Sequence, residues 1–161
     1  MGYRNPIVNK PAVLIIDDEE GIRKLLTVIL NENGYNADSA KDGQEAIKKT
    51  HEKFYNIALI DIVLPDMNGV ELLTKIKETK PKMRKIIMTG NPSVQNAVGA
   101  LNNGADAYIM KPLDIGKVLA TLEDQLKKQK EERETAIQQF ERGRLRGRID
   151  VLGRESQALD I

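Results

Sequence analysis

Residues 13–23 read VLIIDDEEGIR, an apolar run that ends in consecutive acidic side chains and then takes on helical spacing. The same change recurs further along, where residues 57–61 read IALID. A short, continuously apolar segment with polar boundaries is typical of a parallel strand that is buried on both faces. These two stretches therefore predict the centre of a parallel sheet, with acids where its strands end.

Around this centre, apolar and β-favouring segments predict five strands in all. They lie at residues 13–16, 35–40, 57–60, 86–88 and 107–110. Apolar stripes with helical spacing separate or follow them: Ile22, Leu25, Leu26, Ile29 and Leu30; Ala46 and Ile47; Val70, Leu73 and Ile76; Val94, Ala97, Val98 and Leu101; Ile115, Leu119, Leu122 and Leu126. Strands that alternate with helices at short intervals form right-handed βαβ units. We therefore expect an α/β fold with a doubly wound, five-stranded parallel sheet.

Residues typical of helix ends support these boundaries. Asp42 precedes the Ala46–Ile47 stripe, where an aspartate side chain accepts hydrogen bonds from the first free N–H groups of a helix. Gly34 and Gly104 follow two of the stripes, at the position where left-handed backbone ends a helix.

The length and composition fit one compact domain with an appendage. The chain has 161 residues, of which 40% are hydrophobic, and 25 Lys and Arg balance 24 Asp and Glu. We expect an N-terminal lead at 1–10, the compact domain at 11–126, and a helical extension with an arginine-rich tail at 127–161.

The composition also excludes several classes of function. The chain has no cysteine, which excludes disulfides, zinc–thiolate sites and cysteine nucleophiles. It has no tryptophan and is only 4% aromatic, which argues against a platform for stacked bases. No apolar run is long enough to cross a bilayer. We expect a cytoplasmic protein with no membrane partner and no direct nucleic-acid partner.

Acidic side chains follow two of the central strands. Asp17, Asp18 and Glu19 follow the first strand, and Asp61 follows the third. Taken singly, such acids are explained as helix caps that complement the helix dipole. Together they meet at one edge of a parallel sheet, and carboxylates without Cys or His favour a hard cation such as Mg²⁺.

A hydroxyl and an ammonium group reach the same edge. Thr89 follows the fourth strand and Lys111 the fifth. Either residue alone is ordinary in a loop, but beside acids and a metal both are suited to contact phosphoryl oxygens. Neither a GxxxxGK[ST] nor a GxGxxG loop occurs, so a carboxylate is the natural phosphoryl acceptor.

Four segments resemble the response-regulator receiver domain of two-component signalling. They are VLIIDDEEGIR (13–23), ALIDIVLPDMNGVELL (58–73), KIIMTG (85–90) and GADAYIMKP (104–112). The resemblance covers residues 11–126 and implies the flavodoxin-like (βα)5 fold. It also implies a signalling phosphoprotein, not an enzyme, which takes a phosphoryl group from a histidine kinase or a phosphotransfer protein.

The resemblance implies a role for each matching residue of the acidic pocket. Asp61 is the residue expected to be phosphorylated. Asp18, Asp61 and the backbone carbonyl of Val63 are expected to bind Mg²⁺, with Asp17 acting through water and Glu19 at the rim of the pocket.

The remaining matches concern the phosphoryl group and the output. Thr89 and Lys111 are expected to contact the phosphoryl group, Thr89 and Tyr108 to act as the switch, and Lys111–Pro112 to be a cis peptide. A downstream protein is expected on the face formed by the fourth helix (the 94–101 stripe), the fifth strand and the fifth helix.

Val63 lies two residues after Asp61, a position that influences phosphoryl lifetime in this family. An apolar side chain cannot orient a hydrolytic water there, so we expect slow autodephosphorylation. An aspartate-based phosphohydrolase of the haloacid dehalogenase kind needs an Asp at that position as its acid and base.

His51, the single histidine, is expected on the surface.

The extension leaves a further alternative and one structural prediction. A truncated DNA-binding regulator is the alternative, since the segment after Leu126 is too short for a helix-turn-helix output domain. The apolar seam that ends at Leu126 would continue at heptad spacing through Gln129, Arg133, Ala136 and Phe140, two of which are polar. Gly143 and Gly147 cost roughly 1 kcal/mol each relative to Ala, which predicts that the helix ends near Phe140.

Beyond that point Leu145, Ile149 and Leu152 form a short amphipathic stretch that cannot bury itself. We expect this stretch and the extended helix to pack against a protein partner or a second copy, which would make a homodimer.

Overall fold

The structure is a computed structural model that describes residues 9–90 and 99–159. Its strands are β1 (Ala12–Ile16), β2 (Asn36–Ala40), β3 (Ile57–Asp61), β4 (Arg84–Thr89) and β5 (Ala107–Met110). Its helices are α1 (Glu20–Glu32), α2 (Gly43–Glu52), α3 (Gly69–Lys75) and α5 (Ile115–Leu159).

The five strands form one parallel sheet in the order β2-β1-β3-β4-β5. The strand order changes direction at β1, which pairs with β2 on one side and with β3 on the other. In such a sheet, ligands bind beyond the carboxyl ends of the strands at this switch point. The predicted doubly wound, five-stranded parallel sheet is confirmed.

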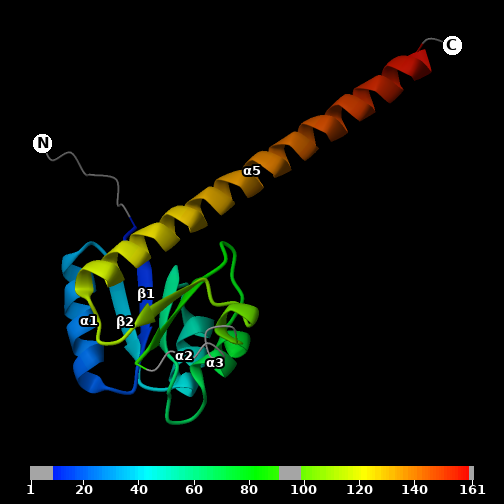
Figure 1. Ribbon diagram of the computed structural model, residues 1–161. Coiled ribbons are helices and arrows are strands. Elements are labelled where there is room, and N and C mark those ends of the chain that lie inside the picture. The colour runs from blue at the N-terminus through cyan, green and yellow to red at the C-terminus, as the bar shows by residue number, and fades with distance from the viewer. Residues whose placement is uncertain (1–8, 91–98, 160–161) are drawn as a thin grey trace, which may run out of the picture.

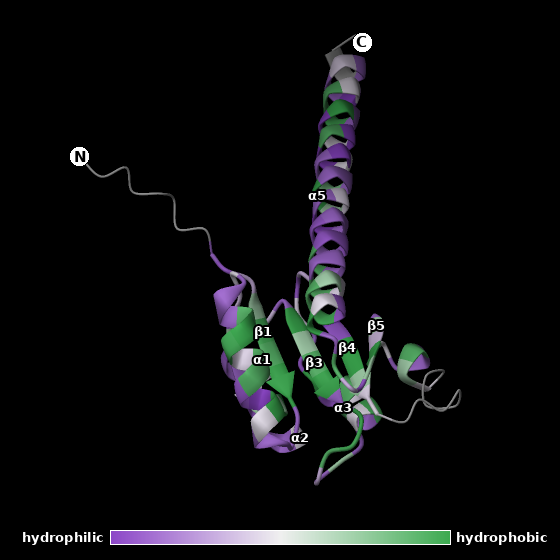
Figure 2. Ribbon diagram, turned by 60° about the vertical axis from the view of Figure 1, so that its left-hand side comes forward, coloured by the Kyte–Doolittle hydropathy of each residue, from purple (hydrophilic) through white to green (hydrophobic). Residues whose placement is uncertain are grey.

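Helices cover both faces of the sheet (Figure 1). Leu26 of α1 and Leu122 of α5 pack on one face, and Ala46 of α2 and Leu72 of α3 pack on the other. Strands β1, β3 and β4 are buried along their whole length. Burial on both faces explains why these strands are continuously apolar where they cross the core (Figure 2).

The helix-end signals are confirmed, and one member of the first apolar stripe is exposed. The Asp42 side chain accepts from the Glu45 N–H at 2.8 Å, and Gly34 and Gly104 have φ of 88° and 99°. Leu25, by contrast, is 52% exposed. Leu25 therefore lies at the edge of its apolar stripe, because the buried side of α1 is centred on Leu26 and Leu30.

The predicted fourth helical stripe, 94–101, falls mostly on residues 91–98, which lie outside the described residues. Gly99–Asn102 are helical, and Leu101 at the end of the stripe is exposed.

Helix α5 is a single helix of 45 residues that leaves the domain as a long arm (Figure 1). The prediction that it ends near Phe140 is therefore wrong. Glycine lowers the stability of a helix without excluding helical dihedral angles, and a helix already anchored at one end extends cooperatively through weak positions. No helix within the described ranges is long and apolar enough to cross a membrane.

Polar side chains anchor α5 at the amino ends of the strands. Arg84, which starts β4, is buried and donates from Nε to Gln125 Oε1 and from Nη1 to Glu132 Oε1, both at 2.8 Å. A buried guanidinium must be paired in this way, because an unpaired one would be costly.

A second buried side chain, Gln129, continues this attachment. Its amide nitrogen donates to the backbone carbonyls of Asn56 at 3.1 Å and Lys82 at 2.8 Å, and its oxygen accepts from the Asn56 side chain at 3.0 Å. The contact between α5 and the domain therefore continues past Leu126, on the side of the sheet opposite the strand carboxyl ends.

Gly69 starts α3 in close contact with the end of β3. A Cβ at this position would lie 2.3 Å from the Asp61 carbonyl oxygen and 2.8 Å from Ile62 Cα, both of them backbone atoms. We therefore expect Gly69→Ala to lower the free energy of unfolding by about 1–3 kcal/mol through overpacking, measured by denaturant unfolding.

The matched control is Gly21→Ala in α1, where a Cβ would meet nothing within 4 Å. This change should leave stability unaltered or raise it by about 0.5–1 kcal/mol. Similar losses from both variants would show that close packing at Gly69 is not the cause.

Candidate functional site

Two buried carboxylates lie next to each other because their strands are neighbours in the sheet. Asp17 directly follows β1 and Asp61 ends β3, and the two strands pair in parallel register. Asp17 is 0% exposed and Asp61 is 6% exposed. Asp18, the next residue along the chain, is exposed at the rim of the same edge.

Lys111 crosses from the far side of the sheet to these two acids. It follows β5, and its backbone N–H donates to the Thr89 carbonyl at 2.7 Å, which holds it against the end of β4. Its Nζ donates to Asp17 Oδ2 at 2.8 Å and to Asp61 Oδ2 at 3.3 Å. The peptide bond between Lys111 and Pro112 is cis. Residues more than 90 positions apart in the sequence thus form one ion-pair cluster.

The segment after Asp61 holds the carboxylate from the other side. The Val63 N–H donates to Asp61 Oδ1 at 3.2 Å, so the two oxygens of Asp61 have different partners. The Gly69 N–H donates to the Ile62 carbonyl at 2.8 Å, and Val63 forms a bridge with Asn68. The Val63 side chain is 70% exposed and points away from the core.

The electrostatics of the cluster follow from burial and charge. Burial raises the pKa of Asp61, and the neighbouring charge of Asp17 adds to this effect against the Val63 N–H and the charge of Lys111. Burial by itself would lower the pKa of Lys111, but its hydrogen bond to Asp17 and the charges of both acids raise it. The cluster therefore favours the charged form of Lys111 and makes ionisation of Asp61 more costly than in water.

Asp17, Asp18 and Asp61 also fit a metal ion. Each offers one carboxylate oxygen, and these atoms lie within 4.8 Å of one another. An all-oxygen donor set with a partly exposed member suits Mg²⁺, which takes one or two carboxylates and keeps several waters. Two of the three acids are paired with Lys111, so a cation and the ammonium group would compete for them.

Of the two predicted switch residues, Thr89 lies next to this cluster, because its carbonyl accepts from the Lys111 N–H. Thr89 ends β4 and is 1% exposed. Tyr108 lies on β5, packed against the core, and its buried hydroxyl has no hydrogen-bond partner within the part of the chain that is described. A buried hydroxyl in this state is costly, which makes this side chain a candidate for movement.

Other predicted residues lie further out. Glu19 is exposed at the start of α1, and its N–H donates to Asp17 Oδ1 at 2.9 Å. His51 is exposed on α2, as expected, and its ring bonds only locally, to the Ile47 carbonyl.

Two residues near the site were missed from the sequence. Arg23 donates from Nη1 to the Asp17 carbonyl at 2.8 Å, and Asp66 accepts from the N–H groups of Gly43 and Gln44 at 2.9 Å each. Asp66 therefore ties the segment after Asp61 to the start of α2. Its position after Pro65 indicates a turn, but its partners Gly43 and Gln44 lie 23 and 22 residues earlier in the sequence.

Comparisons with known proteins agree with this geometry. The family model of the response regulator receiver domain matches residues 13–123. Response regulator ArlR of Staphylococcus aureus is 34% identical over 117 residues, which are 73% of this chain and 53% of that protein. The chain spans about half the length of the curated relatives that it matches.

Solved structures show the same fold. A CheY-like response regulator receiver domain protein from Methanospirillum hungatei JF-1 is 41% identical with a TM-score of 0.73, over 76% of this chain and 98% of the other. NtrX from Brucella abortus in complex with ATP is 28% identical with a TM-score of 0.72, over 78% of this chain and 29% of the other. The parallel sheet, the acids at its carboxyl edge and the matched residues 13–123 together show that this chain belongs to the response regulator receiver domain family of two-component systems.

Proposed function

We propose that the chain accepts a phosphoryl group on Asp61 from the phosphohistidine of a histidine kinase or a phosphotransfer protein, and then changes a protein-binding surface. The observation that carries this proposal is the contact of one ammonium group, Lys111 Nζ, with both Asp17 and Asp61. It places a fixed positive charge beside a carboxylate at the switch point of the sheet, where an anionic group would arrive.

The transfer itself needs little beyond positioning and charge. An oxygen of Asp61 would attack phosphorus, the bond from phosphorus to the imidazole nitrogen would break, and the electron pair would leave with the imidazole. Lys111 would exchange its contact with Asp61 for a phosphoryl oxygen, and the Thr89 hydroxyl would bind a second one. Mg²⁺ held by Asp17, Asp18, Asp61 and the Val63 carbonyl would neutralise the charge of the transferred group.

The output would use Thr89 and Tyr108, which would connect the site to the face formed by β5 and α5. A hollow of about 500 Å³ lies on this face, lined in part by Tyr108, Met110, Lys117 and Thr121. Met110 is 58% exposed beside it. An apolar rim around a hollow suits a downstream protein, and phosphorylation would alter it through Tyr108.

A phosphohydrolase is a weaker proposal than a signalling switch. Its acid and base would come from the position of Val63, which carries an apolar, exposed side chain.

Histidine kinases present their phosphohistidine in the cytoplasm, and we place the chain there. A truncated DNA-binding regulator stays an alternative, because the chain spans about half the length of its curated relatives.

Incubation with Mg²⁺ and a small phosphoryl donor, followed by intact-mass measurement, tests the proposal. We expect the wild type to gain one phosphoryl group and Asp61→Ala to gain none. Asp66→Asn is the matched control, since Asp66 lies in the same loop but outside the acidic cluster, and it should gain the group as the wild type does. A wild type without any gain would contradict phosphorylation of this chain.

The division of roles between Asp18 and Lys111 gives a second prediction. Asp18→Ala removes one of three converging carboxylates and should abolish Mg²⁺ binding. Lys111→Ala removes a competing charge from Asp17 and Asp61, so its Mg²⁺ affinity should equal or exceed that of the wild type. Isothermal titration measures both, and an equal loss in the two variants would refute the assignment.

Stability should depend on pH in a way that identifies Asp61. Burial raises the pKa of this carboxyl, so the folded state holds the proton more tightly than the unfolded chain does. The ionised group therefore lowers stability at neutral pH, and this loss disappears as the pH falls through the raised pKa. Without divalent ions, Asp61→Asn should raise the Tm at neutral pH, and the gain should shrink in acid.

Asp66→Asn gives a control of opposite sign. Backbone N–H groups of Gly43 and Gln44 outweigh burial and lower the pKa of Asp66. Its ionised form therefore contributes stability that is lost as the pH falls, so this variant should not be more stable than the wild type. A Tm gain of Asp61→Asn that is constant with pH would mean that its titration is not responsible.

A further inference from the structure

The distal part of α5 carries an apolar stripe that nothing covers within the described residues. Leu145, Ile149 and Leu152 are 58%, 67% and 63% exposed. They follow each other at intervals of four and three residues, which places them on one side of the helix. The hydrogen bonds from α5 to the domain, as far as the chain is described, end at Glu132. Figure 2 shows apolar residues reappearing along the outer arm after a polar middle.

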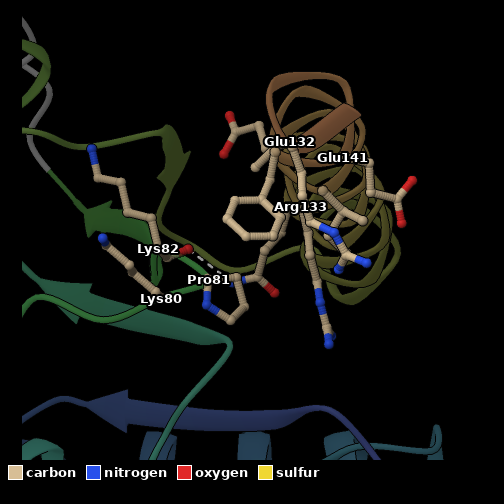
Figure 3. A pocket seen from close by; sticks show the side chains of 11 residues that line it. Lys80, Pro81, Lys82, Glu132, Arg133 and Glu141 are labelled. Atoms are coloured by element: carbon tan, nitrogen blue, oxygen red, sulfur yellow. Dashed lines mark hydrogen bonds between the residues drawn. The ribbon is translucent and has the colours of Figure 1, made fainter. Parts of the chain in front are cut away.

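A different side of α5 faces the domain. A hollow of about 690 Å³ lies between the Lys80–Lys82 loop and this side of the helix, where Ala136, Ile137 and Phe140 line it. Figure 3 shows Pro81 facing the helix and the side chain of Glu141 pointing away from the loop. The seam that runs from Leu122 to Phe140 therefore faces the domain first and then the loop that contains Pro81.

The distal stripe lies on the opposite side of the helix from that seam. Successive residues of an α-helix are turned by roughly 100°. Ile149 follows the buried Gln129 by 20 residues, which turns it by about 200° relative to the side chain that is bonded to the domain. Leu145, Ile149 and Leu152 therefore point away from the receiver domain of their own chain.

The stripe has the pattern of a two-stranded coiled coil. With Leu145 and Leu152 at d, Ile149 takes position a, and a β-branched residue at a with Leu at d favours parallel dimers. Polar side chains, Arg142 and Ser156, occupy the a positions on either side and bound the apolar part.

Charges beside the stripe complement each other in the parallel register. Glu141 takes position g and Arg146 takes the following e, the two positions that meet between parallel chains. The pair occurs twice in a symmetric dimer. Gly143 and Gly147 take positions b and f, which lie away from the interface, whereas Gly153 takes position e at its edge.

The arm also needs a partner for its stability. Gly143, Gly147 and Gly153 each cost about 1 kcal/mol relative to Ala. Most helical stability in proteins comes from the packing of an amphipathic face. An arm with three glycines and an uncovered apolar face would gain helix stability by packing against another chain.

We propose that residues 141–156 of α5 pair with the same residues of a second copy as a parallel coiled coil. Because the stripe points away from the domain, the two receiver domains lie on opposite outer sides of the pair and do not collide. The interaction does not involve Asp61, so its test is separate from that of phosphorylation.

Cysteine cross-linking of the full chain tests the register directly, since the protein has no native cysteine. Leu145→Cys and Leu152→Cys should each form disulfide-linked dimers under mild oxidation, because equal d positions meet in a parallel pair. Val151→Cys, at the outer position c, is the control and should remain uncoupled. Equal cross-linking of Val151→Cys, or coupling only between mixed Leu145→Cys and Ile149→Cys chains, would overturn the parallel register.

Light scattering of the uncross-linked chain gives the independent measurement. We expect a mass of twice 18.0 kDa at high concentration, lost in Ile149→Lys but kept in Val151→Lys. Glu141→Arg should weaken dimerisation by about tenfold, and adding Arg146→Glu should restore it, whereas Glu134→Arg, which faces an uncharged Gln139, should have little effect. A wild type that stays monomeric at millimolar concentration would refute the proposal.

Discussion

The ammonium group of Lys111 between Asp17 and Asp61 is the contact on which the functional edge of the sheet depends. Two buried carboxylates at the ends of neighbouring strands repel each other, and burial makes that repulsion stronger. Lys111 offsets it from the far side of the sheet, with its Nζ at 2.8 Å and 3.3 Å from the two acids. Any cation or phosphoryl group that enters must therefore displace or share this contact, which couples ligand binding to the position of β5.

Strand β4 links this edge to the other end of the molecule. Its last residue, Thr89, lies at the acids, and its first residue, Arg84, holds α5 through Gln125 and Glu132. The arm therefore has a fixed direction relative to the sheet, since a buried guanidinium with charged and amide partners tolerates little rotation of the helix. The acidic cluster and the attachment of the arm therefore lie at opposite edges of the same sheet.

The sequence was sufficient to predict the sheet and the convergence of Asp17, Asp61 and Lys111, because parallel strands must present their carboxyl ends together. It was insufficient for the length of α5 and for the exposure of Leu25. Helix propensity treats each glycine locally, whereas the helix is anchored by Arg84 and Gln129, whose partners are distant in sequence. Likewise, the spacing of the leucines in α1 does not show which of them lies at the edge of the buried side, because that depends on how the helix packs on the sheet.

The surroundings of α5 explain why its heptad seam becomes polar after Leu126 and why apolar residues later return on another side of the helix. Up to Gln129 the seam meets the domain, and buried polar groups there are paired with backbone carbonyls. Beyond Gln129 the same side of α5 faces the loop that contains Pro81 across a hollow. A continuous apolar seam there would have no close surface to pack on. Apolar residues return at Leu145, five residues after Phe140, turned by about 140°. A helix that packs on its own domain first and on a second chain later requires such a change of side.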